Sequence, residues 1–194
     1  MSNIYIHRNI VVGFHGGEKD TLLKVLNDPA MNLSMSINDY DWLGSGVYSW
    51  LNDPERAFQW AKENKKCENP FVLGAIIDLG NCLDLSVQSS LDALKASYDD
   101  LSNQGKVLNK LNKKRDAGNF ALIRPLDCMV INYSCEMIAK TRPDATINTI
   151  IGYFEEGGFL YPGTDIHALS HAQICVRTAE ISILGYFLPK VNAS

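Results

Sequence analysis

The 194-residue sequence has no long apolar run, no excess of basic charge and no paired cysteine motif. A membrane-spanning helix needs about 20 consecutive apolar residues, so none is expected. The start of the sequence lacks the charged-then-apolar order of a signal peptide, and we therefore expect a cytoplasmic protein that does not bind membranes. Lys and Arg total 18 against 22 Asp and Glu, and the net charge of -4 weakens, without excluding, a nucleic-acid target.

The sequence also lacks the motifs of several cofactor-binding and disulfide-stabilised protein classes. The five cysteines form no C-x-x-C pair and several lie inside apolar runs, so we expect buried free thiols, no disulfide frame and no metal site. No G-x-G-x-x-G segment follows a strand and opens a helix, which argues against a Rossmann dehydrogenase. A cysteine protease has no specific support, because any of five cysteines could be paired with any of four histidines.

Helical and strand patterns are mixed along the chain, without internal repeats. Apolar and β-branched runs predict strands, the last of which could also be a short helix, at residues 9–17, 47–50, 70–79, 146–154, 172–177 and 181–188. Amphipathic spacing predicts helices at residues 19–26, from residue 54 onward and in an insertion of about residues 86–140, where 126–137 could instead be a buried strand. The prediction is a single α+β domain over residues 1–194 with a helical insertion.

A histidine stands at the end of the first predicted strand, where two glycines follow it. His15 could use its ring to bond a ribose hydroxyl, while the bare backbone of Gly16 offers N–H and C=O groups to a flat carboxamide. The alternative is a histidine that only satisfies hydrogen bonds in a turn. From the residues alone, the two interpretations are about equally supported.

A tyrosine follows a second turn, which is bracketed by glycines. The loop of residues 44–46 precedes Tyr48, so the tyrosine ring could form one wall of a slot for a planar heterocycle. Trp60 on the following helix, or failing it Phe58, could form the opposite wall. Either ring could equally be an ordinary core residue, as most such side chains are.

One polar residue begins a late strand that is otherwise apolar. The side-chain amide of Gln173 could hold a ribose hydroxyl and orient the sugar. It cannot supply the negative charge that a carboxylate lends to a developing oxocarbenium ion. Its alternative role is only to cap the edge of the sheet.

In this order the three segments resemble the motifs of the ADP-ribosyltransferase superfamily, in the His-Tyr-Glu branch that diphtheria-toxin-like enzymes share with poly-ADP-ribose polymerases. Phe14-His15-Gly16-Gly17 is similar to the first motif, and Gly44-Ser45-Gly46-Val47-Tyr48 is similar to the more specific second motif. The resemblance implies a split antiparallel β-sheet core with flanking helices. It also implies that His15 contacts a ribose of NAD+, Gly16 clamps the carboxamide and Tyr48 stacks on nicotinamide. Gly17, Ser45 and Trp60 complete the implied cofactor-binding set.

The third motif departs from the family pattern, because Gln173 stands where the family usually has Glu. A carboxylate from the preceding loop could replace the missing acid, and Glu156 is preferred over Glu155 because two glycines follow it and give it freedom to reach inward. Alternatively, Gln173 suffices for a target that brings its own nucleophile. The resemblance therefore implies Tyr48, Gln173 and Glu156 as the catalytic residues.

By this resemblance the protein is a mono-ADP-ribosyltransferase that breaks the nicotinamide–ribose bond of NAD+ and passes ADP-ribose to a macromolecular target, a protein, RNA or DNA. Small bacterial members are often toxins or phage-defence effectors, which implies a cognate antitoxin as partner. Residues 159–171 stand where the family has its target-recognition loop. Three alternatives remain open: an NAD+ glycohydrolase, a catalytically silent module that binds a nucleotide or a partner, and a structural α+β protein.

Overall fold

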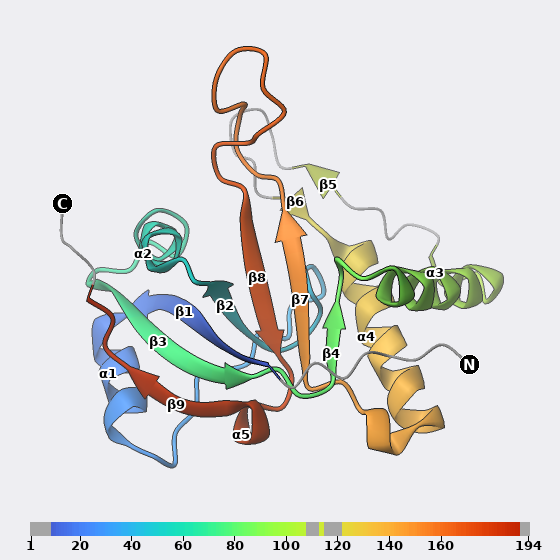
Figure 1. The fold of residues 1–194 in the computed structure, drawn as a ribbon, viewed down its shortest axis with the longest axis horizontal. Helices are drawn as coiled ribbons and strands as arrows, with labels where there is room; N and C mark the ends of the chain where they lie inside the picture. The colour runs from blue at the N-terminus through green and yellow to red at the C-terminus, as the bar shows by residue number, and fades with distance from the viewer. Residues whose placement is uncertain (1–8, 108–112, 115–121, 191–194) are drawn as a thin grey trace.

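The computed structural model describes residues 9–107, 113–114 and 122–190. Seven of the described strands form one open sheet in the order β4-β7-β8-β2-β1-β3-β9, in which every neighbouring pair is antiparallel except β4 and β7 (Figure 1). These strands are β1 (Ile10–Glu18), β2 (Val47–Leu51), β3 (Pro70–Asp78), β4 (Cys82–Asp84), β7 (Thr149–Phe154), β8 (His171–Val176) and β9 (Ile183–Phe187). Two short strands, β5 (Lys113–Lys114) and β6 (Leu122–Ile123), pair with each other.

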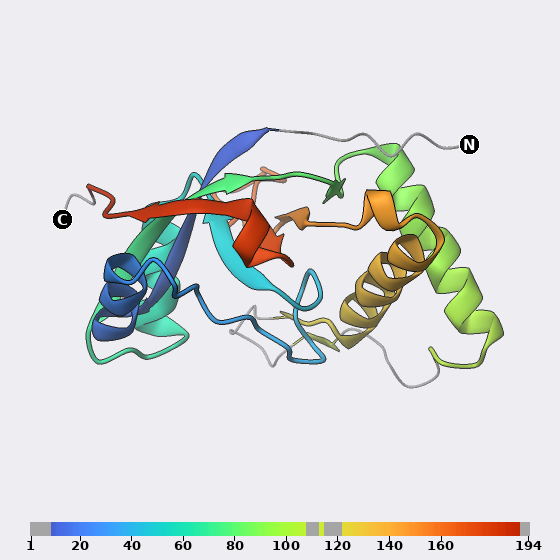
Figure 2. The ribbon, with the colours of Figure 1, turned by 90° about the horizontal axis from the view of Figure 1, so that it is seen from below.

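Helices lie around the sheet at both of its ends. They are α1 (Lys19–Asn27), α2 (Pro54–Glu63), α3 (Gln88–Asn103), α4 (Pro125–Thr141) and the short α5 (Ala179–Ser182). α1 and α2 pack against the half of the sheet that contains β1 and β3, whereas Figure 2 shows α3 and α4 side by side at the other end. The chain is α+β with a mostly antiparallel sheet, as predicted. None of the helices in the described ranges is long and apolar enough to cross a membrane.

Local sequence explains where the second helix begins. Pro54 occupies its first turn, and the Asp53 carboxylate accepts a hydrogen bond from the Arg56 N–H at 2.8 Å. Proline fits this position because the first turn of a helix has no internal partner for its N–H groups, and an acceptor before the helix satisfies one of those that remain. The predicted start of this helix is confirmed.

The sheet separates two buried faces. On one face, Leu22 of α1 and Leu73 of β3 belong to the same core cluster. On the other face, Phe14 and Trp50 pack with Ala57 of α2. Farther along that face, α4 contributes to a third cluster with residues of β4, β7 and β8. Since both faces are covered, the central strands are apolar on both sides.

The predicted insertion of about residues 86–140 contains α3, the β5–β6 pair and α4. Helices are present in this range as α3 and α4, and residues 108–112 and 115–121 lie outside the described residues. The choice of a helix for residues 126–137 is also confirmed, by α4. Two short strands, β5 and β6, interrupt the helical insertion.

The described strands of the main sheet form one continuous, mostly antiparallel sheet. β1 and β2 nevertheless share only the register pairs Gly13↔Leu51 and Phe14↔Trp50, whereas β1 and β3 are paired along the whole of Ile10–Glu18. Beyond Phe14 the two central strands therefore diverge. Because the few bonds between β1 and β2 are retained, the sheet bends at this point without breaking.

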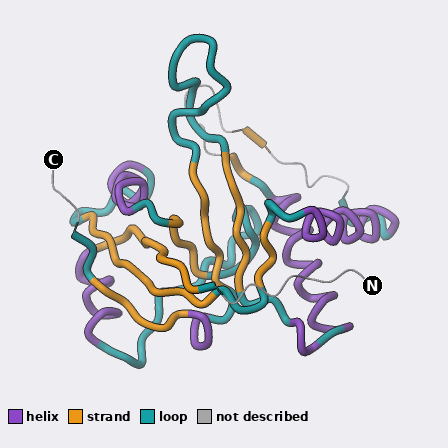
Figure 3. Tube along the Cα trace, in the orientation of Figure 1, coloured by secondary structure: helices purple, strands orange, loops and turns teal. Residues whose placement is uncertain are grey.

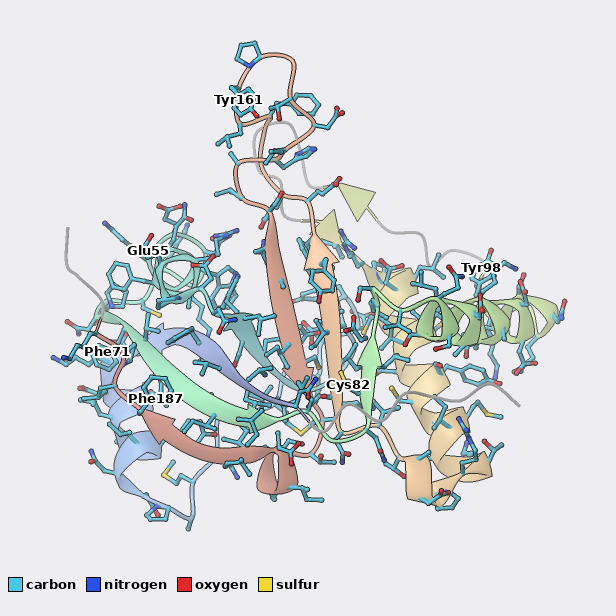
Figure 4. The ribbon with its side chains drawn as sticks, viewed as in Figure 1. Glu55, Phe71, Cys82, Tyr98, Tyr161 and Phe187 are labelled. Atoms are coloured by element: carbon cyan, nitrogen blue, oxygen red, sulfur yellow. The ribbon has the colours of Figure 1, made fainter. Side chains whose placement is uncertain are left out.

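The connection between β7 and β8, residues 155–170, projects beyond the ends of both strands (Figure 3). Its apolar side chains are exposed, with Phe159, Leu160, Tyr161 and Ile166 between 53% and 66% accessible. Figure 4 places Tyr161 far from the sheet on this loop. These apolar side chains are therefore accessible for contact with a partner.

Candidate functional site

Three adjacent strands carry the three predicted segments. β8, β2 and β1 are neighbours in the sheet, and they hold Gln173, Tyr48 and His15 respectively. Register pairs join Phe14 to Trp50 and Trp50 to Gln173, and cross-strand partners share a face of the sheet. Because side chains alternate along a strand, Tyr48 and Gln173 point to the α2 and α4 side. The same rule directs the Cα–Cβ bond of His15 to the α1 side.

His15 lies where β1 and β2 diverge, and its ring bridges the two strands. Its Nδ1 atom is 2.7 Å from the main-chain O of Tyr48. Burial, with the positive charge of Lys65 as a smaller cause, lowers the pKa of His15 to about 4, so the ring is neutral at pH 7. A neutral ring that donates from Nδ1 keeps a lone pair on Nε2, which can accept a hydrogen bond from a hydroxyl group.

Gly16 has a packing reason to be glycine. A Cβ atom there would lie 2.0 Å from the main-chain O of Ala57, so α2 approaches β1 closely only because the side chain is absent. A Cβ atom on Gly17 would make only ordinary contacts with Leu22. The Gly16 carbonyl accepts a hydrogen bond from Lys65 Nζ at 3.3 Å. The carbonyl that was expected to clamp a carboxamide is therefore already bonded to Lys65.

Tyr48 is fixed in place through its hydroxyl group. The hydroxyl donates to the Gly44 carbonyl at 2.6 Å and accepts from the Leu43 N–H at 2.8 Å. Burial raises the pKa of Tyr48, so the hydroxyl stays protonated at neutral pH. The ring packs against the core cluster that includes Ile131 of α4 and Cys175 of β8. These contacts suit a side chain that presents a rigid ring better than one that transfers protons.

The expected slot between Tyr48 and Trp60 is not formed. Trp60 packs against Trp50, with ring centroids 5.4 Å apart, and Lys65 Nζ lies 5.0 Å from the centroid of the Trp60 ring. Tyr48 contacts the α4 cluster instead. The reason is position along β2, because Trp50 lies two residues beyond Tyr48 and occupies the place next to α2. Phe58, the alternative wall, is 37% exposed.

Ser45 is held by residues of α4 and of the segment after β8. Asn132 Oδ1 accepts from the Ser45 N–H at 3.0 Å, and Asn132 Nδ2 donates to Ser45 Oγ at 3.3 Å. Arg177 Nη1 donates to the Ser45 carbonyl at 3.2 Å and to Asn132 Oδ1 at 2.8 Å. The residue implied as a cofactor contact therefore helps to fix the loop that precedes β2.

Four polar side chains form a connected group, which we call the Arg56 cluster: Arg56, Glu156, His171 and Gln173. Arg56 Nη2 lies 2.5 Å from Glu156 Oε2, and the two side chains are only 9% and 11% exposed. His171 Nδ1 is 2.7 Å from the Leu169 carbonyl and 3.6 Å from Glu156 Oε2. On the other side of the ring, Gln173 Nε2 and His171 Nε2 are 2.9 Å apart.

These contacts set the tautomer of His171 and the orientation of Gln173. Donation from Nδ1–H to the Leu169 carbonyl leaves Nε2 to accept from the Gln173 amide. Burial lowers the pKa of His171, which favours this neutral form. With its Nε2 atom committed, Gln173 presents Oε1 as a hydrogen-bond acceptor. The Glu156 carboxylate lies beside this imidazole, 3.6 Å from the Nδ1 atom that donates to Leu169.

Sequence reasoning identified Glu156 and Gln173 but missed Arg56 and His171. His171 stands two residues before Gln173 on the same strand, and this spacing, which puts both side chains on one face, could have indicated it. The apolar pattern of α2 predicts that Arg56 lies on the polar face of the helix, yet its side chain is buried and only 8% exposed. Its partner is 100 residues away, so nothing local to Arg56 signals the pair.

A cavity of about 720 Å³ opens beside the Arg56 cluster. The start of α4, the end of β7 and the projecting loop line it through Arg124, Tyr153, Phe154, Glu155, Asp165, Ile166, Ser170 and His171. Its volume lies within the range of small-molecule sites, about 300–1,000 Å³. Glu155 lines this cavity, whereas Glu156 turns to Arg56, so the two neighbouring acids have different surroundings.

Neither a metal site nor a comparison with known proteins identifies the function of this site. Among the described residues, no group of three or more His, Cys, Asp or Glu side chains could hold a metal ion. All five cysteines are free thiols, as predicted, and four of them are buried. In comparisons with known proteins, the chain matches no family model, no curated protein and no solved structure.

Proposed function

We propose that the protein is an NAD+-consuming mono-ADP-ribosyltransferase with a macromolecular target, and that its sheet is a variant of the ADP-ribosyltransferase core. The observation that carries the proposal is the adjacency of β1, β2 and β8. Segments that resemble three successive family motifs, far apart in the sequence, lie on neighbouring strands. Short motifs that arise by chance in unrelated elements have no reason to meet in this way.

In this proposal Gln173 holds the ribose of the nicotinamide half from the α2 and α4 side of the sheet, and His15 reaches a ribose hydroxyl group at the point where β1 and β2 diverge. His15 offers Nε2 as an acceptor, and Gln173 offers Oε1 from an amide that His171 holds in one orientation. Oriented acceptors on the ribose hydroxyl groups stabilise the positive charge that develops at the anomeric carbon when its bond to nicotinamide breaks. The ring of Tyr48, fixed by its hydroxyl group, would give nicotinamide a rigid surface to stack on.

The carboxylate that position 173 lacks is supplied by the preceding loop. Glu156 Oε2 lies 3.6 Å from the ring of His171, which binds Gln173, and its charge acts on the sugar without contact, reduced by the ion pair with Arg56. The acceptor group of the target attacks the anomeric carbon, and the electron pair of the broken bond leaves with nicotinamide. The proton of the acceptor goes to a base, for which Glu155 and Asp165 on the cavity wall are the accessible carboxylates.

One contact has to change before NAD+ can bind in the expected way. Lys65 Nζ occupies the Gly16 carbonyl, which is the group implied to receive the carboxamide N–H. Lys65 reaches this carbonyl with a flexible side chain, so a carboxamide can replace it if the ammonium group moves toward solvent. Trp60 stays packed on Trp50 and takes no part in this arrangement.

The test is incubation of the purified protein with NAD+ labelled in its adenylate phosphate and with a whole-cell lysate, which is then separated into protein, DNA and RNA. The wild type is expected to release nicotinamide and to label one of the three fractions. Gln173→Met and His15→Leu should each slow transfer by about 100-fold, because each removes one acceptor. Gln88→Met changes an exposed amide on α3 and is the matched control, so it should leave the rate unchanged.

Each other outcome has its own meaning. Nicotinamide release without label in any macromolecule identifies an NAD+ glycohydrolase. A rise in melting temperature with NAD+ but without its consumption identifies a silent binding module, because a ligand that binds only the folded state stabilises it. The absence of both NAD+ consumption and a thermal shift would overturn the proposal.

A further inference from the structure

A second cavity, of about 330 Å³, lies between α3 and α4. Arg124 and Phe154 belong to the linings of both cavities, so these two side chains separate it from the cavity beside the Arg56 cluster. Figure 2 shows the two helices that flank it, and Figure 4 labels Tyr98, which lines it from α3. Most of the remaining lining is apolar and includes Trp42, Leu94, Val130 and Ile131.

Arg124 is a partly buried cation in this largely apolar lining, beside the carboxylate of Asp127. Its guanidinium carbon lies 4.4 Å from the centroid of the Trp42 ring and 4.9 Å from that of Phe154. The side chain is 20% exposed, its Nε atom is buried without a hydrogen-bond partner, and Nη1 is 3.6 Å from Asp127 Oδ2. Asp127 also lines the cavity and is the carboxylate that pairs with Arg124. A cation in such surroundings is stable only when its charge and its N–H groups are matched.

The other cation in the lining, Lys95, is exposed to solvent and is not held in the apolar part of the cavity. The Lys95 side chain is 69% exposed and its Nζ atom lies 2.5 Å from Asp99 on the next turn of α3. It is hydrated and paired, so it adds little to the recognition of a ligand. Arg124 is therefore the group that distinguishes this cavity from an ordinary apolar groove.

We propose that the cavity between α3 and α4 binds a small aromatic anion, whose ring lies among Trp42, Phe154 and Tyr98 and whose acidic group binds Arg124. A flat apolar ring gains free energy by leaving water for such a lining. A carboxylate or sulfonate matches the planar guanidinium and can accept from the N–H groups that Asp127 does not take. The volume is at the low end for small-molecule sites, which fits one ring system and excludes a dinucleotide.

Two fluorescent probes with the same aromatic framework separate the charge from the apolar contact. 8-Anilinonaphthalene-1-sulfonate is anionic, and N-phenyl-1-naphthylamine is its uncharged analogue. We expect the sulfonate to bind the full-length protein at one saturable site, with energy transfer from Trp42 that Trp42→Phe removes. Arg124→Met should weaken sulfonate binding by about 10- to 100-fold, which corresponds to the loss of a charge-assisted hydrogen bond. It should change the affinity of the uncharged probe by less than about threefold, because Met keeps the apolar part of the side chain.

Two further variants keep the result interpretable if Arg124→Met unfolds. Arg124→Lys retains the charge and should hold the sulfonate more tightly than Met does, whereas Val130→Phe fills the cavity and should abolish binding of both probes. Phe159→Ser removes an exposed apolar side chain from the projecting loop and should leave both affinities unchanged. Equal sulfonate affinity with and without the Arg124 charge, binding that Phe159→Ser abolishes, or no saturable binding to the folded wild type would overturn the proposal. The outcome is independent of NAD+ turnover.

Discussion

Removing one charge of the Arg56–Glu156 ion pair is expected to destabilise the protein strongly. The two side chains are 9% and 11% exposed, and their charged atoms lie 2.5 Å apart. Glu156→Gln leaves the Arg56 cation buried, with Gln59 Oε1 3.3 Å away and with its own Nε atom unpartnered. Breaking a buried pair from one side costs about 3–5 kcal/mol. For a chain of this length, that loss lowers the melting temperature by about 6–20 °C.

A double-mutant cycle separates the pair from its surroundings. Arg56→Met and Glu156→Gln are made singly and together, and the free energy of unfolding is measured by urea denaturation at pH 7. The double variant should cost less than the sum of the single variants, by about 2–3 kcal/mol, because it leaves no unpaired charge in the interior. Single variants that each cost under about 1 kcal/mol, or a double variant that is simply additive, would show that the pair behaves as a hydrated surface pair.

Three further predictions concern the centre of the sheet. Gly16→Ala should lower the free energy of unfolding by about 3 kcal/mol, because its Cβ atom would meet the main-chain O of Ala57, whereas Gly17→Ala, the control, should change it by less than about 1 kcal/mol in the same urea assay. Tyr48→Phe leaves the Leu43 N–H unpaired and the Gly44 carbonyl with only the Cys175 thiol, 3.8 Å away, and should cost about 1–3 kcal/mol; an unchanged urea midpoint would refute this. As the pH is lowered from 6.5 to about 4, the unfolded chain takes up a proton that the buried ring of His15 resists. The free energy of unfolding therefore decreases as the pH is lowered through this window. The wild type should lose up to about 3 kcal/mol more than His15→Asn there, and equal pH slopes would contradict the burial argument.

Elements with strong local signals could be predicted from the sequence. The signals are the cap before α2 with the proline at its first position, the β-branched run of β1 and the apolar run of β3, and each is contained in a few consecutive residues. β4 was missed because Cys82–Asp84 is too short for an alternating pattern. Its place in the sheet depends on parallel pairing with β7, which is far away in the sequence. No local pattern contains that information.

The geometry of the site was harder to predict, because it depends on which face of the sheet each side chain occupies. A shift of one residue in register moves a side chain to the other face. His15, Tyr48 and Gln173 were correctly placed on strands. Only the register reveals that the His15 side chain starts on the opposite face of the sheet from the other two. Likewise, Tyr48 and Trp50 are both aromatic residues of β2, and the packing of α2 decides which of them meets Trp60.

Glu156 was preferred because the glycines after it were expected to give it freedom, and the structure gives a different reason for its position. Gly157 has a φ of +82°, and the Leu169 N–H bonds the Glu156 carbonyl at 2.9 Å, so the turn holds this residue in place. Arg56 then fixes the carboxylate itself. A charge that is fixed by the fold can stabilise a developing cation without reorganising. Under the proposed function, Glu156 supplies the charge and Gln173 the hydrogen bond, two tasks that a single Glu at position 173 would combine.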